Sequence, residues 1–199
     1  MKKLNSIQIA KKLREKGVVL FSPLDFQRMF EASNFSARNF INRHISTGLF
    51  VKVRNGLYAF SENMPPRFLI ANKLYSPSYI SFETALSFYH IMPETIYTVF
   101  SATPKASRRF TSLSTDYAYH RIRRDLFFGY LAEKIESVTV MIAEPEKALL
   151  DYLYFVDLKK KTLSDRIDIK RVSKKTLLKY ARAFKRKGLL VLISRIYDK

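Results

Sequence analysis

The chain has 199 residues, of which 47% are hydrophobic, and this length allows one sizeable core or two small ones. It has 36 Lys and Arg residues against 17 Asp and Glu, a formal charge of +19 that indicates a polyanionic partner. There is no cysteine, which excludes disulfides, thiolate zinc sites and cysteine nucleophiles. The three histidines lie in separate segments, so we expect no metal ion and no other cofactor.

Neither a membrane span nor a signal peptide is expected from the sequence. No segment approaches the roughly 20 consecutive apolar residues that cross a bilayer, and the first residues lack the apolar run of a signal peptide. We therefore expect a soluble cytoplasmic protein with no membrane partner.

Positive charge is concentrated at the two ends of the sequence. Residues 1–62 carry a net charge of +7, residues 63–158 carry none, and residues 159–199 carry +12. Two consecutive prolines, Pro65 and Pro66, are expected to end a strand and to block an immediate helix. The sequence therefore predicts two domains, at residues 1–62 and 63–199.

Two helices are predicted at the start of the first domain. Apolar residues recur at helical spacing over residues 4–16, at Leu4, Ile7, Ala10 and Leu13. Gly17 follows as a stop signal, and a short apolar link comes next. Ser22 is an N-cap candidate, followed by a proline at the first helical position and by Asp25 at the capping-box position. The second helix is expected to begin there and to end near residues 32–33.

A third helix and a hairpin complete the first domain. Ser33 or Asn34 is expected to cap a helix that runs to Gly48, and Asn55-Gly56 separates two β-prone runs. Three short helices followed by a hairpin predict a winged helix-turn-helix, whose third helix enters the major groove of DNA. The expected DNA-binding residues are Ser36, Arg38, Asn39, Asn42 and Arg43 for base edges or phosphates, and Lys52 and Arg54 on the wing for phosphates.

Three segments of the chain resemble a known family. They run from Lys52 to Ala59, from Ser78 to Leu86 and from Ile142 to Asp151. In this order and spacing they are similar to the AbiEi-type antitoxins and transcriptional regulators of type IV toxin–antitoxin systems, which act in phage abortive infection. The resemblance implies a repressor of its own operon that counteracts a co-encoded nucleotidyltransferase toxin, usually without a stable complex. It also implies inverted-repeat operators, occupied by a dimer or by cooperating monomers.

The second domain is predicted to be mixed α/β, which makes the whole chain α+β. Helices are expected over residues 81–90 and 144–154, and strands over residues 95–103 and 137–143. Glu146 and Lys147 fall in the first turns of the later helix, where a structural role is expected rather than a catalytic one.

A basic helix is predicted near the C-terminus. Ser173 is expected to cap a helix that runs to Lys187, with Gly188 as its stop and Leu177, Leu178, Ala181 and Phe184 facing the core. A cationic stripe is predicted on this helix, formed by Lys175, Lys179, Arg182 and Arg186. Because residues 169–197 contain no acidic residue, the stripe favours a second contact with a DNA backbone or with RNA.

The central arginines allow two interpretations. These are Arg108, Arg109, Arg121, Arg123 and Arg124. They either pair with the acidic residues Asp116, Asp125, Glu133 and Glu136, or contact a phosphate or the toxin.

Two other classes of function compete with a sequence-specific repressor. A nuclease would need carboxylates to hold magnesium, and the candidates are Asp116, Glu133, Glu144 and Glu146. No paired-carboxylate motif, Gly-rich phosphate loop or activated nucleophile accompanies them, so we expect the protein not to be an enzyme. A general RNA-binding or ribosome-associated protein would also carry this charge, together with aromatic residues for stacking on bases.

Overall fold

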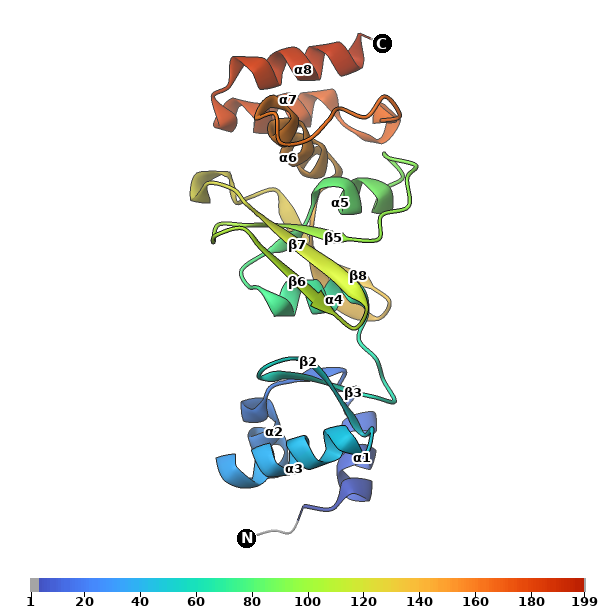
Figure 1. Cartoon of the computed structure of the whole chain (residues 1–199). Helices are drawn as coiled ribbons and strands as arrows, with labels where there is room; N and C mark the ends of the chain where they lie inside the picture. The colour runs from blue at the N-terminus through green and yellow to red at the C-terminus, as the bar shows by residue number, and fades with distance from the viewer. Residues whose placement is uncertain (1–3, 199) are drawn as a thin grey trace. The chain divides into compact units, whose positions relative to one another are not determined.

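The computed structural model describes residues 4–198 as a mixed α+β protein (Figure 1). The chain divides into two compact units, one that ends at Pro66 and one that begins at Arg67. Helix α4 (Arg67–Leu74) starts directly after Pro66, so the prediction that the prolines block an immediate helix is wrong. A proline that precedes the first helical turn removes no helical hydrogen bond, because the N–H groups there have no intrahelical acceptor.

The first unit combines three helices with a small antiparallel sheet. Its elements are α1 (Ser6–Glu15), β1 (Leu20–Phe21), α2 (Pro23–Phe30), α3 (Asn34–Ser46), β2 (Phe50–Arg54) and β3 (Leu57–Phe60). The strands pair in the order β1-β3-β2. Asn55 and Gly56 form the hairpin turn as predicted, and Gly56 has a φ of 78°, a conformation that favours glycine. The apolar link predicted before α2 contains strand β1.

Capping residues fix the starts of α2 and α3 as the sequence predicts. Ser22 Oγ accepts a hydrogen bond from the backbone N–H of Asp25 at 3.2 Å, and the Asp25 carboxylate accepts one from the backbone N–H of Ser22 at 2.8 Å. Ser33 caps α3 in the same way through the N–H of Ser36. These bonds satisfy N–H groups that the helices leave without partners.

The core of the first unit is aromatic. Phe26 packs between its ring neighbours, with centroid distances of 5.6 Å to Phe40 and 5.8 Å to Phe21. Phe50 of β2 completes the cluster at 5.1 Å from Phe21. The helical spacing that predicts α1 includes Ile7, but its side chain is 78% exposed, and the buried residues of α1 are Ile9, Ala10 and Leu13.

The second unit is built on a six-stranded mixed sheet. Its strands are β4 (Tyr79–Ile80), β5 (Val99–Thr103), β6 (Arg108–Ser112), β7 (Thr115–Arg121), β8 (Tyr130–Ile135) and β9 (Val138–Ala143), in the order β6-β7-β5-β4-β9-β8. The pairs β4–β9 and β5–β7 are parallel and the other pairs are antiparallel. The predicted strands correspond to β5 and β9.

Helices cover both faces of this sheet. Consecutive residues of a strand point to opposite faces. Tyr119 donates a hydrogen bond to the carbonyl of Ala71 in α4, whereas the ring of His120 lies 5.0 Å from Phe82 of α5 (Phe82–Phe88) and 5.1 Å from Phe155 of α6 (Pro145–Asp157). Helix α4 therefore packs on one face, and α5 and α6 pack on the other.

A side-chain amide completes the sheet where β4 is short. Strand β4 joins β9 at the single pair Ile80 and Ile142. Next to this pair, Asn72 of α4 donates to the carbonyl of Met141 at 3.2 Å and accepts from the N–H of Met141 at 2.6 Å. The Asn72 amide thus satisfies the backbone N–H and C=O of Met141, a residue that β4 does not reach.

Two helices, not one, follow α6 and its connecting segment. They are α7 (Lys174–Phe184) and α8 (Lys187–Tyr197), and short 3-10 turns lie at Arg124–Leu126 and Ile169–Arg171. Lys185 adopts a left-handed conformation that ends α7, and Gly188 lies inside α8, so its predicted role as a stop is wrong. A Cβ on Gly188 would stand 2.1 Å from Asp157 Oδ1, which gives this glycine a packing role instead.

Candidate nucleic-acid interface

Helix α3 presents a polar face to solvent. Its inner face buries Ala37, Phe40 and Ile41 against the aromatic core. The outer face carries four of the predicted DNA-binding residues, all with exposed side chains: Arg38, Asn39, Asn42 and Arg43. Because residues three and four apart share a face of a helix, this face offers guanidinium and amide groups together. Such groups can bind base edges and phosphates through paired hydrogen bonds.

Ser36 is placed differently from the other members of this set. It is half-buried, and its hydroxyl accepts a hydrogen bond from Ser33 Oγ at 2.9 Å. Its backbone N–H is also bonded to Ser33. Ser36 therefore takes part in the cap of α3, where its hydroxyl accepts one bond and keeps its own O–H to donate.

The two predicted wing cations lie on the hairpin. Lys52 and Arg54 are exposed on β2, opposite Tyr58 and Leu57 of β3, and a register shift separates them. Lys52 and Arg54 are two residues apart on the strand, so both point to the exposed side while Val53 between them is buried. No acidic residue occurs between Glu31 and Glu62, so neither α3 nor the hairpin carries a compensating carboxylate.

Phe35 also lies on the outer part of α3, and it was absent from the predicted set. Its side chain is 74% exposed in the first turn of the helix. The spacing could have identified it, because Phe35 stands three and four residues before Arg38 and Asn39 but five before buried Phe40.

The predicted C-terminal stripe is shorter in the structure. Lys175, Lys179 and Arg182 are exposed on α7, and none of them forms an ion pair within residues 4–198. Arg186 does not belong to this helix: it precedes α8, and its guanidinium pairs with Asp157. The prediction that Arg186 continues the stripe is therefore wrong, because α7 ends one turn too early.

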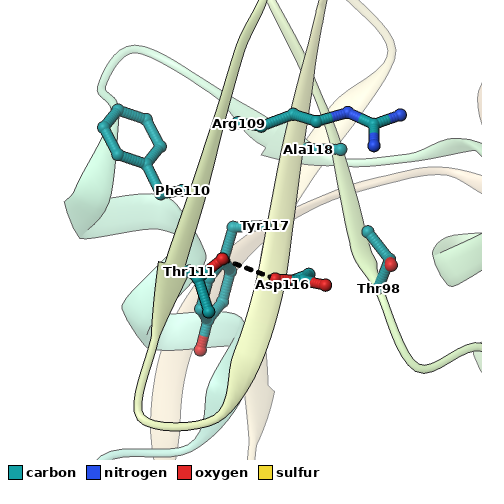
Figure 2. Close-up of a pocket in the computed structure, with 7 residues that line it drawn as sticks. All are labelled: Thr98, Arg109, Phe110, Thr111, Asp116, Tyr117 and Ala118. Carbon is teal, nitrogen blue, oxygen red and sulfur yellow. Dashed lines mark hydrogen bonds between the residues drawn. The ribbon is translucent and has the colours of Figure 1, made fainter.

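The central arginines differ in whether they pair with an acidic residue. The predicted pairing is confirmed for Arg123, which binds Asp125 at 2.7 Å. Arg109 instead lines an open groove of about 260 Å³ on the face of β6 and β7 (Figure 2). In this groove Asp116 accepts a hydrogen bond from Thr111 at 2.7 Å, and within the described chain no ion pair joins it to Arg109.

His120 lies on the same face of the sheet, toward α6. Its ring stacks on Phe100 at 5.7 Å. Burial, with smaller contributions from the positive charges of Lys161, Arg109 and Lys160, lowers the pKa of His120 to about 4. The ring is therefore neutral near pH 7.

The polar residues of two of the family-like segments meet in the core of the second unit. Lys147 and Asp151 of α6 form a fully buried ion pair. Tyr79 donates to Asp151 Oδ2 at 2.9 Å and Ser81 donates to the same oxygen at 2.8 Å, while Lys147 Nζ lies 2.8 Å from the Tyr79 hydroxyl. We call these four residues the buried network. Burial lowers the pKa of Lys147, and burial followed by the charge of Asp151 raises that of Tyr79.

The carboxylates considered for a nuclease are dispersed and engaged elsewhere. Glu144 accepts a hydrogen bond from Tyr180 at 2.5 Å, and Glu146 accepts one from the backbone N–H of Ser173 at 2.9 Å. Both therefore hold α7 against the start of α6. Glu133 accepts from Tyr89 at 3.3 Å. Within residues 4–198 no group of three or more His, Cys, Asp or Glu side chains is arranged to hold a metal ion.

Two further findings bear on function. Among the described residues, no helix combines the length and the apolar character that a membrane crossing requires. Comparison of the sequence with models of known families and with curated proteins finds no match. The function must therefore be argued from the residues and their placement.

Proposed function

We propose that the chain is a sequence-specific DNA-binding repressor whose first unit is a winged helix-turn-helix. The observation that carries this proposal is the outer face of α3, where Arg38, Asn39, Asn42 and Arg43 are exposed together and no acidic residue lies nearby in the sequence. A helix of this composition fits the major groove, where arginine can bridge guanine acceptors and asparagine can pair with adenine.

The hairpin and α7 would add sequence-independent affinity. Lys52 and Arg54, which are exposed on β2, would neutralise phosphates beside the proposed recognition helix. Lys175, Lys179 and Arg182 would provide further phosphate contacts from the second unit. Arg186 does not contribute to this binding, because its guanidinium pairs with Asp157. Ser36 would still be able to donate its O–H to a phosphate or a base edge.

The biological role we propose follows the resemblance to the AbiEi-type regulators. In this role the chain represses its own operon at inverted repeats and acts as the antitoxin of a co-encoded nucleotidyltransferase toxin. The buried network joins two of the three segments on which this resemblance rests. Tyr79 and Ser81 belong to the segment from Ser78 to Leu86, and Lys147 and Asp151 belong to the segment from Ile142 to Asp151.

The test is binding of the purified chain to the duplex upstream of its own gene and to a scrambled duplex, each at two salt concentrations. Non-specific binding rests on phosphate contacts and weakens steeply with salt, whereas base contacts maintain a preference. We expect a preference for the upstream duplex that persists at the higher salt. Equal binding to both duplexes that disappears with salt would contradict the proposal and favour a general RNA-binding or ribosome-associated role.

A further inference from the structure

Phe35 is placed unlike every other phenylalanine in the protein. The chain contains 16 phenylalanines, all within the described residues, and Phe35 is the one whose side chain is exposed. Its 74% exposure leaves most of the ring in water. Other rings of this unit, such as those of Phe26 and Phe40, pack against each other in the core.

The fold of the first unit gives no reason for an aromatic residue at this position. Helix α3 contributes Ala37, Phe40 and Ile41 to the core from its opposite side. The start of the helix is fixed by the side chain of Ser33, which bonds to Ser36. Single exposed apolar side chains such as Ile7 occur elsewhere on the surface, so exposure alone does not set Phe35 apart; its place on α3 beside Arg38 and Asn39 does.

The charge around Phe35 indicates the chemistry of its partner. Arg38 and Asn39 follow it on the same part of the helix, and after Glu31, four residues before Phe35, no Asp or Glu occurs until Glu62. The partner is therefore polyanionic and yet offers an apolar group. In the major groove of DNA the apolar group is the C5 methyl of thymine, which phenylalanine is able to contact.

We propose that Phe35 contacts a thymine methyl group and helps to determine which duplex the chain binds. This inference rests on the proposed function and adds a specificity-determining residue to it. The position of Phe35 in the first turn agrees with recognition helices whose N-terminal residues meet the base edges. It also provides discrimination against RNA, because uracil lacks the methyl group.

The test replaces single thymines of the upstream duplex with deoxyuridine, which removes the methyl group and keeps the base-pairing pattern. We expect the full-length chain to lose about fourfold in affinity at one or two of these positions, the effect of one buried methyl group. Phe35→Ala should bind the unmodified duplex about tenfold more weakly and should be insensitive to the same replacements. Ile7→Ala is the matched control, since Ile7 is 78% exposed on α1.

The outcomes separate this inference from the proposed function. If the unaltered chain prefers the upstream duplex but Phe35→Ala binds as tightly as Ile7→Ala, Phe35 makes no base contact and only the inference fails. The inference also fails if Phe35→Ala binds more weakly but retains the sensitivity to deoxyuridine, since the ring then covers some other group. Equal binding of the unaltered chain to upstream and scrambled duplexes would overturn both.

Discussion

In the first unit the cationic and amide side chains of α3 lie outside an aromatic core, whereas the second unit encloses Lys147 and Asp151 completely. Within residues 4–198 neither Arg38 nor Arg43 forms an ion pair, so these exposed groups of α3 are available to a ligand. The enclosed groups of the buried network satisfy one another and specify how α6 packs against β4. Charged side chains thus stabilise the fold in the second unit, whereas those on the outer face of α3 are the ones that we propose for recognition.

The largest effect is expected from breaking the buried ion pair. Lys147→Met should lower the free energy of unfolding by about 3–5 kcal/mol, because Asp151 would remain charged in the core without its partner. Urea unfolding followed by tyrosine circular dichroism would measure this, since eleven of the 12 tyrosines belong to the second unit and Tyr58 alone to the first.

The matched control for this variant is Lys134→Met, on an exposed position of β8. It should change the free energy of unfolding by less than about 0.5 kcal/mol. Replacing both partners, as Lys147→Met with Asp151→Leu, should recover part of the loss. The comparison between the units would break down if Lys147→Met were as mild as Lys134→Met.

Removal of an exposed cation on α3 should act on binding and not on folding. Arg38→Ala should weaken binding to the upstream duplex by about 1–3 kcal/mol and relax the preference for one base pair. Anisotropy titrations with single-base variants of the duplex would show both effects. Arg28→Ala, at an exposed position of α2, is the control, and equal behaviour of the two variants would show that α3 is not the recognition helix.

Acidification should destabilise the second unit through His120. Its folded-state pKa of about 4 lies below the ordinary value of 6.5, so between these pH values the unfolded chain binds more protons. The free energy of unfolding should therefore decrease as the pH falls from about 6.5 to about 4. His120→Phe should reduce this slope, measured by urea unfolding at several pH values, whereas His90→Asn at an exposed position should not. Identical slopes for all three proteins would contradict the assignment.

The smallest effect should separate two basic residues that the sequence groups together. Lys179→Ala should weaken binding to all duplexes alike and reduce the salt dependence by about one counterion. Arg186→Ala should leave the salt dependence unchanged and instead lower stability, because its partner Asp157 would lose an ion pair. Titrations of DNA binding at several salt concentrations would measure the salt dependence of both variants. An equal decrease in the two variants would show that Arg186 also contacts phosphates.

Local signals explain why the first unit follows the sequence closely. Ser22, Asp25 and Ser33 cap helices through bonds to residues three positions away, and Asn55-Gly56 closes a two-residue turn. Such contacts are encoded within a few residues and can be predicted without knowledge of the fold. The exposed positions on α3 follow from its periodicity in the same way.

The elements that were missed in the second unit depend on distant contacts. Helix α4 buries Phe68, Leu69, Ile70 and Ala71 in succession, so it shows no amphipathic period. Strand β6 begins with two exposed arginines, and β4 has only two residues. The end of α7 at Lys185 and the fit of Gly188 against Asp157 are also decided by contacts that spacing does not contain. Arg186 was wrongly assigned to the cationic stripe for the same reason, because spacing does not show that α7 ends before it.

The amide of Asn72 links the packing of one helix to the continuity of the sheet. Strands β8 and β9 join the other four strands through one residue pair and through this side chain. A loss of α4 would therefore leave the pair of Ile80 and Ile142 as the backbone pairing between the two ladders, beside the stacked rings of Tyr79 and Tyr130. The sheet and α4 consequently form one cooperative element. Hydrogen exchange at the backbone N–H of Met141 would therefore report whether α4 is packed on the sheet.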